Sequence, residues 1–206
     1  MEIRRGRSRS EVKIRSVGGT MNGLRVGVYG YGFAGKAFAH LVKVLGAEVY
    51  VFDPYAKEIP AEFTRVTSLE DLFEKAQAVS IHAALTAETR KAVTAELLAK
   101  LPDQGIVVNT ARGARIDQDA LFAELKAGRL RAGLDVLDPD HLPEDHEARE
   151  WENLIYGSHC FGQFESWPGE SPLTRRDVNV INNLKRFIAG EPLQDTIDEH
   201  RYRLMT

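Results

Sequence analysis

A glycine-rich turn between an apolar run and a helix-like segment restricts the fold of this chain more than any other feature. The apolar run covers residues 24–29, the turn is Gly30–Gly35 (GYGFAG), and the helix-like segment covers 36–45. A second strand-like run, 47–52, ends at Asp53. Glycines in this strand–turn–helix–strand setting, with an acid about 20 residues further on, predict a dinucleotide-binding βαβ unit.

Each position of the turn has a physical reason. Gly30 allows the tight turn, Gly32 lets the backbone approach a pyrophosphate, and Gly35 lets the helix pack close to the sheet. Free N–H groups at the helix N-terminus then favour the phosphates. Asp53 accepts hydrogen bonds from ribose hydroxyls, and its charge disfavours a 2′-phosphate. No arginine follows Asp53 in residues 54–55, so the sequence predicts NAD in preference to NADP.

Composition excludes several classes of protein. With 206 residues the chain suits one domain with a sizeable core, and a net charge of −3 gives no general reason to expect nucleic acid or an anionic membrane as a partner. No run approaches the ~20 apolar residues that span a bilayer. Cys160 is the only cysteine, which predicts no intrachain disulfide and a cytoplasmic location. The six histidines are scattered without metal-ligand spacing, so we expect no metal site.

The N-terminus differs from the rest of the chain. Residues 4–9 (RRGRSR) are strongly basic, and Lys13 and Arg15 continue the run. Such runs are usually solvated arms, with nucleic-acid contact as the less favoured interpretation. No apolar segment marks a secretory signal. We expect a basic arm over 1–21, one NAD-binding Rossmann domain over 22–193 and a tail over 194–206.

Short apolar runs alternate with amphipathic segments from residue 24 to residue 190. This pattern predicts an α/β fold: a Rossmann-like, doubly wound parallel sheet with helices on both faces. The expected strands are Arg25–Tyr29, Glu48–Phe52, Arg65–Val66, Ala78–His82, Ile106–Asn109, Ala132–Asp135 and Leu154–Tyr156. The expected helices are 36–45, 69–76, 95–101, 118–126 and a long one that begins at Ser171-Pro172 and ends at Gly190. The predicted N-caps are Ser68 (in a capping box with Asp71), Thr94 and Asp117. Residues 139–152 are acidic and unpatterned, which indicates a loop.

Polar segments follow three of the expected strands. These are 109–113 (NTARG), 135–140 (DVLDPD) and Ser158-His159. The carboxyl ends of parallel strands meet at one edge of a sheet, so all three segments should line one crevice.

Two side chains in these segments have the chemistry of an active site. A buried Arg112 would need an anion, and its planar fork suits a carboxylate or a carbonyl being polarised; a structural ion pair is the alternative. The imidazole of His159 titrates near neutral pH and suits proton transfer in a carbinol–carbonyl interconversion, with a structural histidine as the alternative. An acid from 135–140 could pair with it and stabilise its charged form.

Taken together, these residues resemble the NAD-binding domain of the D-isomer-specific 2-hydroxyacid dehydrogenases. The resemblance covers residues 22–193 in order. It rests on Gly30–Gly35, Asp53-Pro54, His82, Leu85–Arg90, Asn109–Gly113, Leu134–Val136, Ser158-His159 and Ala189–Pro192. It implies hydride transfer between a nicotinamide and C2 of a small 2-hydroxy or 2-oxo acid, and a homodimer that pairs through the nucleotide domain.

The resemblance also implies residue roles. Arg112 matches the arginine that binds the substrate carboxylate and carbonyl, His159 the general acid/base, and Asp140 the acidic partner of that histidine. Asp135 matches the aspartate that faces the nicotinamide carboxamide. The other expected cofactor-binding residues are Gly30, Gly32, Phe33, Ala34, Gly35, Asp53, Pro54, His82, Thr110 and Ala111.

Four departures from the family pattern stand out. Asp140 replaces a glutamate, and its shorter side chain would need a backbone shift to reach His159. Phe33 stands where an arginine is common, which predicts the loss of a pyrophosphate contact. Ala84 replaces a proline, and Cys160-Phe161 replace smaller residues.

The family's substrate lobe comes mostly from residues before the nucleotide domain. Here residues 1–21 precede it, and they align loosely with the end of the connecting helix. We therefore expect a cofactor-binding half whose chemistry needs a substrate lobe. The alternative function is a non-catalytic NAD-binding regulatory module with a protein partner.

Overall fold

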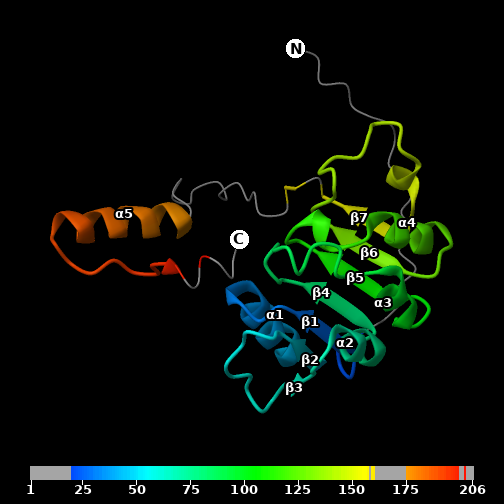
Figure 1. Ribbon diagram of the computed structural model, residues 1–206, viewed down its shortest axis with the longest axis horizontal. Coiled ribbons are helices and arrows are strands. Elements are labelled where there is room, and N and C mark those ends of the chain that lie inside the picture. Colours follow the sequence, from blue (N-terminus) through cyan, green and yellow to red (C-terminus); the bar gives the residue numbers. More distant parts are fainter. Residues whose placement is uncertain (1–19, 158, 161–174, 200–201, 203–206) are drawn as a thin grey trace.

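Seven parallel strands form a single sheet in the order β3-β2-β1-β4-β5-β6-β7 (Figure 1). The computed structural model describes residues 20–157, 159–160, 175–199 and 202. The strands are β1 (Arg25–Tyr29), β2 (Glu48–Phe52), β3 (Thr64–Arg65), β4 (Ala78–Ile81), β5 (Ile106–Asn109), β6 (Arg131–Leu134) and β7 (Leu154–Tyr156). The strand order reverses between β1 and β4, which is where a doubly wound sheet binds its ligand. The predicted Rossmann-like fold is confirmed.

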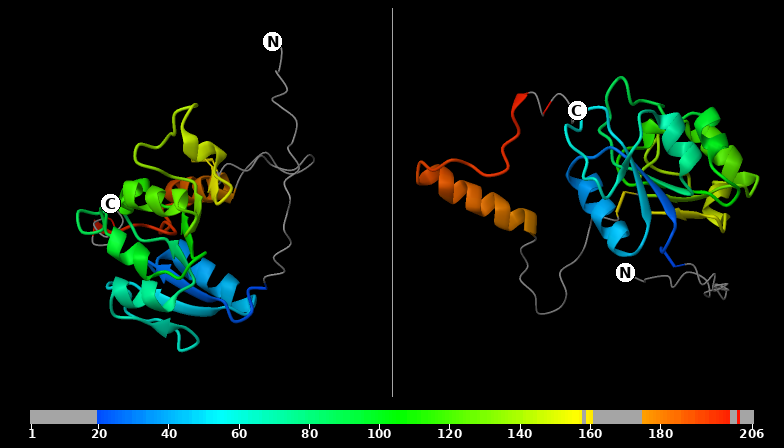
Figure 2. Two further views of the ribbon diagram at one scale, coloured as in Figure 1. Left: turned by 90° about the vertical axis from the view of Figure 1, so that its right-hand side faces the viewer. Right: turned by 90° about the horizontal axis from the view of Figure 1, so that it is seen from below.

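Helices cover both faces of this sheet (Figure 2). They are α1 (Phe33–Val44), α2 (Leu69–Lys75), α3 (Ala95–Lys100) and α4 (Gln118–Lys126), and the chain also contains the 3₁₀ turns η1 (Gly113–Arg115) and η2 (Glu147–Glu150). Helix α5 (Arg175–Ile188) lies apart from the sheet (Figure 1). Helix α1 buries Ala39 and Val42 with Val26 and Val28 of β1 on one face. Helices α2, α3 and α4 bury the larger core on the other face, where each fully buried leucine contributes about 2 kcal/mol.

The register brings the carboxyl ends of the central strands to one level. Tyr29 of β1 lies beside Phe52 of β2 and Ile81 of β4. Ile81 in turn lies beside Asn109 of β5, and Asn109 beside Leu134 of β6. Segments far apart in the sequence therefore leave the sheet along one edge, as the strand-end argument predicts.

The observed ends of the strands and helices agree closely with the ends predicted from the sequence. Strands β3 and β6 each lie one residue earlier than the predicted ranges, and β4 ends one residue earlier, which is the usual variation at strand termini. Helix α1 begins at Phe33 instead of residue 36, because the second half of the glycine turn is already helical. The long helix begins within the described residues at Arg175, and Ser171-Pro172 lie outside them.

Two of the three predicted N-caps are confirmed, whereas the Thr94 cap and the loop predicted for residues 139–152 need correction. The predicted caps Ser68 and Asp117 accept hydrogen bonds from the backbone nitrogens of Asp71 and Ala120 at 3.1 and 3.2 Å. Thr94 occupies the N-cap position of α3 without a cap hydrogen bond; its side chain instead bonds the Glu96 carboxylate and lowers the pKa of that group. The segment 139–152 is not wholly irregular, because it contains η2.

Candidate functional site

The glycine turn has the shape that a dinucleotide requires. Gly30 has φ 93°, and a Cβ atom there would overlap the backbone of Ala83. Gly32 is different, because a Cβ atom there would have no neighbour within 4 Å among the described residues. The turn is therefore closed on the side of the sheet at Gly30 and open at Gly32, where a pyrophosphate would approach.

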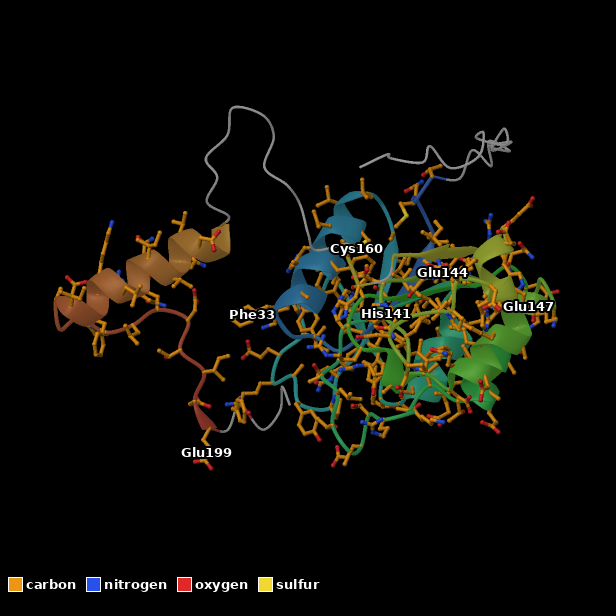
Figure 3. The ribbon with its side chains drawn as sticks, turned by 90° about the horizontal axis from the view of Figure 1, so that it is seen from above. Phe33, His141, Glu144, Glu147, Cys160 and Glu199 are labelled. Atoms are coloured by element: carbon orange, nitrogen blue, oxygen red, sulfur yellow. The ribbon has the colours of Figure 1, made fainter. Side chains whose placement is uncertain are left out.

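The N-terminus of α1 suits a phosphate. Gly32 is the N-cap residue and supplies no side-chain cap, so no side chain of the N-cap competes with an anion at the positive end of the helix. The side chains of Phe33 and Ala34 are exposed in that first turn, and Gly35 is buried. Phe33 projects from the start of α1 (Figure 3), and 71% of its surface is exposed. Because its side chain is a phenyl ring, it offers no charge to a pyrophosphate.

Asp53 holds the two loops beside this helix together. Its Oδ2 atom accepts a hydrogen bond from the backbone nitrogen of Tyr31 at 2.6 Å. Its Oδ1 atom accepts from the backbone nitrogens of Tyr55 and Ala56 at 2.8 and 3.1 Å. Sequence reasoning expects only ribose binding from this residue; the Asx-type turn that begins at Asp53-Pro54 is the signal for the second role.

His82 follows β4 and is uncharged at neutral pH. Its Nε2 atom lies 2.9 Å from Oγ of Ser80, and its ring centroid lies 5.0 Å from that of Phe38 in α1. Burial lowers the pKa of His82 to about 4, and the positive charge of Arg115 contributes to this shift. His82 therefore offers the cofactor edge a neutral ring rather than a cation.

Asn109 shapes the turn after β5. The side chain is fully buried; Nδ2 donates to the carbonyl of Arg112 at 2.8 Å, and Oδ1 accepts from the backbone nitrogen of Ala111 at 3.0 Å. Thr110, Ala111 and Arg112 are thereby presented at the strand edge. No sequence argument assigns this role to Asn109, although its place at the end of a buried strand is the signal.

The buried cation of this turn is Arg115 and not Arg112. Arg112 is exposed, and its Nη1 atom donates to the carbonyl of Ala111 at 2.7 Å. One 3₁₀ turn later the chain pairs with the segment that precedes α3, because the carbonyl of Arg115 accepts from the nitrogen of Val93 at 3.0 Å and Ile116 forms an isolated bridge with Val93. That pairing draws the Arg115 side chain inside, where only 1% is exposed.

Arg115 lacks the partners that a buried cation needs. Within the described part of the chain, Nε and Nη1 have no hydrogen-bond acceptor. Burial lowers the pKa of Arg115 to about 10; Tyr29 opposes this shift, and the charge of Arg112 adds to it. Sequence reasoning does not detect Arg115, since nothing in the pattern around it marks a buried position.

His159 and Asp140 form an ion-pair geometry at the next strand ends. Nδ1 of His159 lies 3.3 Å from Oδ2 of Asp140, and both side chains are about half exposed. The aspartate therefore reaches the histidine despite being shorter than a glutamate. The Tyr156 hydroxyl donates to the carbonyl of Asp140 at 3.0 Å and fixes its backbone. Ser158 lies outside the described residues.

Asp135 is buried below this pair, with 5% of its surface exposed. Its carbonyl accepts from the backbone nitrogen of His159 at 2.5 Å, and its Oδ1 atom accepts from the nitrogen of Cys160 at 2.8 Å. Asp135 thus fixes the course of the segment that carries the histidine.

The chain is similar to known proteins in sequence and in fold. Residues 2–160 match the family described as D-isomer specific 2-hydroxyacid dehydrogenase, NAD binding domain. The chain belongs to this family. It is 31% identical over 176 residues to hydroxypyruvate reductase from Blautia hydrogenotrophica, an alignment that covers 84% of this chain and 53% of that protein.

Solved structures of the family superpose on this fold. The TT0316 protein from Thermus thermophilus has a TM-score of 0.72 and 32% identity over 87% of this chain and 55% of its own. The NAD complex of D-isomer specific 2-hydroxyacid dehydrogenase from Lactobacillus delbrueckii ssp. bulgaricus has a TM-score of 0.72 and 26% identity over 84% of this chain and 57% of its own. The chain spans about half the length of the curated relatives it matches.

NAD fits the residues of this domain. The open position at Gly32, the uncapped first turn of α1 and the acid at the end of β2 supply a phosphate site and a ribose acceptor. Among the described helices, none has the length and apolar content needed to cross a membrane.

Proposed function

We propose that the complete protein reduces a small 2-oxo acid at C2 with NADH and oxidises the corresponding 2-hydroxy acid in reverse. The observation that carries this proposal is the contact between His159 Nδ1 and Asp140 Oδ2 at 3.3 Å, at the same sheet edge as Arg112 and the glycine turn. The relatives named hydroxypyruvate reductase, glycerate dehydrogenase and glyoxylate reductase support this substrate class.

The chain's own residues divide the work in a simple way. NADH supplies the hydride. Arg112, exposed after β5, binds the substrate carboxylate through its fork and polarises the carbonyl. His159 keeps Nδ1 toward Asp140 and gives the proton on Nε2 to the C2 oxygen. Asp140, whose Oδ2 atom lies 3.3 Å from Nδ1 of His159, stabilises the imidazolium before that transfer, and Asp135 would hold the nicotinamide carboxamide.

The substrate lobe is the further part that this reaction needs. Arg112 is exposed, and His159 and Asp140 are each about half exposed. A second lobe would exclude water from them and supply backbone donors to the carboxylate, which strengthens every electrostatic contact. The alignment with hydroxypyruvate reductase from Blautia hydrogenotrophica covers 53% of that protein, and the remaining length of the relative supports the presence of a second lobe in the family.

A homodimer through the nucleotide domain is part of this proposal. Helix α1 and its C-cap residue carry an exposed apolar stripe formed by Leu41, Val44 and Leu45, with 60–85% of each residue exposed. Covering such a stripe with a second copy would remove it from water. A double substitution Leu41→Lys/Val44→Lys should convert the dimer to a monomer in sedimentation analysis. We place the protein in the cytoplasm, because its lone cysteine suits a reducing compartment.

The test is the loss of NADH absorbance with glyoxylate, hydroxypyruvate and other small 2-oxo acids, using the complete protein. His159→Ala and Arg112→Ala should each lower kcat/KM by about 10²–10⁴-fold while NADH still binds. Asp140→Asn should lower it and Asp140→Glu should retain it. His40→Ala is the control, since His40 is an exposed histidine on α1 whose ion-pair partner is Glu62.

Two outcomes would contradict the reductase proposal. One is a rate near wild type in His159→Ala. The other is NADH binding without turnover of any 2-oxo acid by the complete protein, which would favour an NAD-binding regulatory module.

A further inference from the structure

A hydrogen bond joins the two loops that flank the glycine turn. Strand β1 lies between β2 and β4, so the loops that leave β2 and β4 stand on either side of the turn that leaves β1. The hydroxyl of Tyr55, after β2, donates to Oε2 of Glu88, after β4, at 2.7 Å. This contact therefore straddles the carboxyl end of β1, beside the place where the dinucleotide turn begins.

Both residues are held in position from their own loops. The backbone nitrogen of Tyr55 donates to Asp53 Oδ1 at 2.8 Å. On the other loop, Oγ1 of Thr89 accepts from the nitrogen of Thr86 at 2.8 Å and donates to the carbonyl of Ala84 at 2.7 Å. Glu88 therefore lies in a folded turn and not in an extended segment.

Asp53 has little capacity left to bind a ribose. A carboxylate offers about four lone-pair sites, two on each oxygen. Oδ1 already accepts two backbone hydrogen bonds and Oδ2 accepts one, so a single site remains. The adenosine ribose of NAD carries two free hydroxyls, and one of them needs another acceptor. In the described part of the chain, Oε1 of Glu88 accepts no hydrogen bond.

The charges at this edge act together. Burial raises the pKa of Tyr29, at the end of β1, and the carboxylates of Asp53 and Glu88 raise it further, against the opposing charge of Arg115. The hydrogen bond from Tyr55 to Glu88 raises the pKa of the Tyr55 hydroxyl. Both carboxylates thus act at the end of β1, while the nearby cation Arg90 points to Asp138, 3.9 Å away.

We propose that Glu88, oriented by Tyr55, is a second ribose-binding carboxylate that selects NAD and excludes NADP. It accepts the hydroxyl that Asp53 cannot take, and its charge repels a 2′-phosphate. Tyr55 is a positioning residue, since it acts through Glu88. The inference rests on the NAD-binding domain and is independent of the proposed reaction, because it concerns only nucleotide binding.

The experiment titrates the chain with NADH and with NADPH, following protein fluorescence, and compares the two dissociation constants. Glu88→Gln removes the charge, so the ratio of the NADPH dissociation constant to the NADH dissociation constant should fall at least tenfold. A tenfold change corresponds to the energy of about one charge-assisted hydrogen bond. Glu88→Asp keeps the charge and loses reach; it should weaken NADH several-fold and still reject NADPH. Tyr55→Phe should also lower this ratio, but by a smaller factor than Glu88→Gln does.

Glu74→Gln is the matched control, because Glu74 is an exposed carboxylate on α2 with no partner among the described residues. It should leave both dissociation constants unchanged, and thermal melting of each variant verifies folding. The proposal is overturned if Glu88→Gln keeps the wild-type ratio, or if it weakens both nucleotides equally, as a purely structural role would. A wild-type chain that binds neither nucleotide also counts against it.

Discussion

Oδ2 of Asp53 lies 2.6 Å from the backbone nitrogen of Tyr31, and this hydrogen bond fastens the glycine turn to the end of β2. The same carboxylate also holds the nitrogens of Tyr55 and Ala56. The acid expected to recognise the ribose is therefore also the group that shapes the crevice. Stability and nucleotide affinity should change together when it is altered.

Asp53→Ala should lower the free energy of unfolding by about 2–4 kcal/mol, because three backbone N–H groups lose a charged acceptor. Urea denaturation measures this difference. Asp53→Asn should fall between the wild type and Asp53→Ala, since an amide keeps one acceptor oxygen. Glu74→Ala is the surface control and should stay within about 0.5 kcal/mol of wild type. Equal stability of Asp53→Ala and Glu74→Ala would contradict the structural role of Asp53.

Alanine at the first glycine of the turn should lower stability, whereas alanine at the second should lower NADH affinity. Gly30→Ala places a Cβ atom on backbone of φ 93° and against Ala83, so it should cost about 3 kcal/mol or more in unfolding free energy. Gly32→Ala meets no neighbour among the described residues, so it should fold within about 1 kcal/mol of wild type. Its methyl group should raise the NADH dissociation constant about tenfold or more, because it fills the approach to the pyrophosphate. Unchanged NADH affinity in Gly32→Ala would refute that placement.

His82 should make the protein sensitive to acid. Its pKa falls to about 4 in the folded chain from 6.5, through burial and the charge of Arg115. Between these two values the unfolded chain binds a proton that the folded chain does not, so the free energy of unfolding decreases as pH falls through this window. The full loss is at most about 3 kcal/mol. His82→Asn should flatten the dependence between pH 6.5 and 4, relative to its own value at pH 7.5. An unchanged slope would show that other groups carry it.

The buried side chain of Arg115 should lower the free energy of unfolding of the protein. A buried guanidinium without acceptors on Nε and Nη1 in the described part of the chain keeps its desolvation penalty, so Arg115→Met should raise the free energy of unfolding by about 1–3 kcal/mol. It should also raise the pKa of His82, since one source of the downward shift is removed. Arg112→Met is the comparison, because Arg112 is exposed, and it should stay within about 0.5 kcal/mol of wild type. A melting temperature of Arg115→Met below that of Arg112→Met would contradict this prediction.

Much of the fold was predictable because its signals are local. The apolar runs fall on the observed strands to within one residue, and the side chains of Ser68 and Asp117 cap their helices as expected. The contact of Asp140 with His159 follows two adjacent strands that the parallel order predicts to end together. The roles assigned to Arg112, His159 and Asp140 stay predictions until activity is measured.

The sequence by itself determined the βαβ unit, the parallel sheet and the edge where polar groups gather, since each depends on a short pattern of apolar residues and turns. Only the tertiary structure decided that Arg115 and not Arg112 is buried, because that choice depends on the pairing of Ile116 with Val93. Likewise only the tertiary structure showed Asp53 binding Tyr31 and Tyr55 binding Glu88. Those contacts arise between segments that meet when β2, β1 and β4 lie side by side, and long-range strand pairing leaves no mark in any single stretch of sequence.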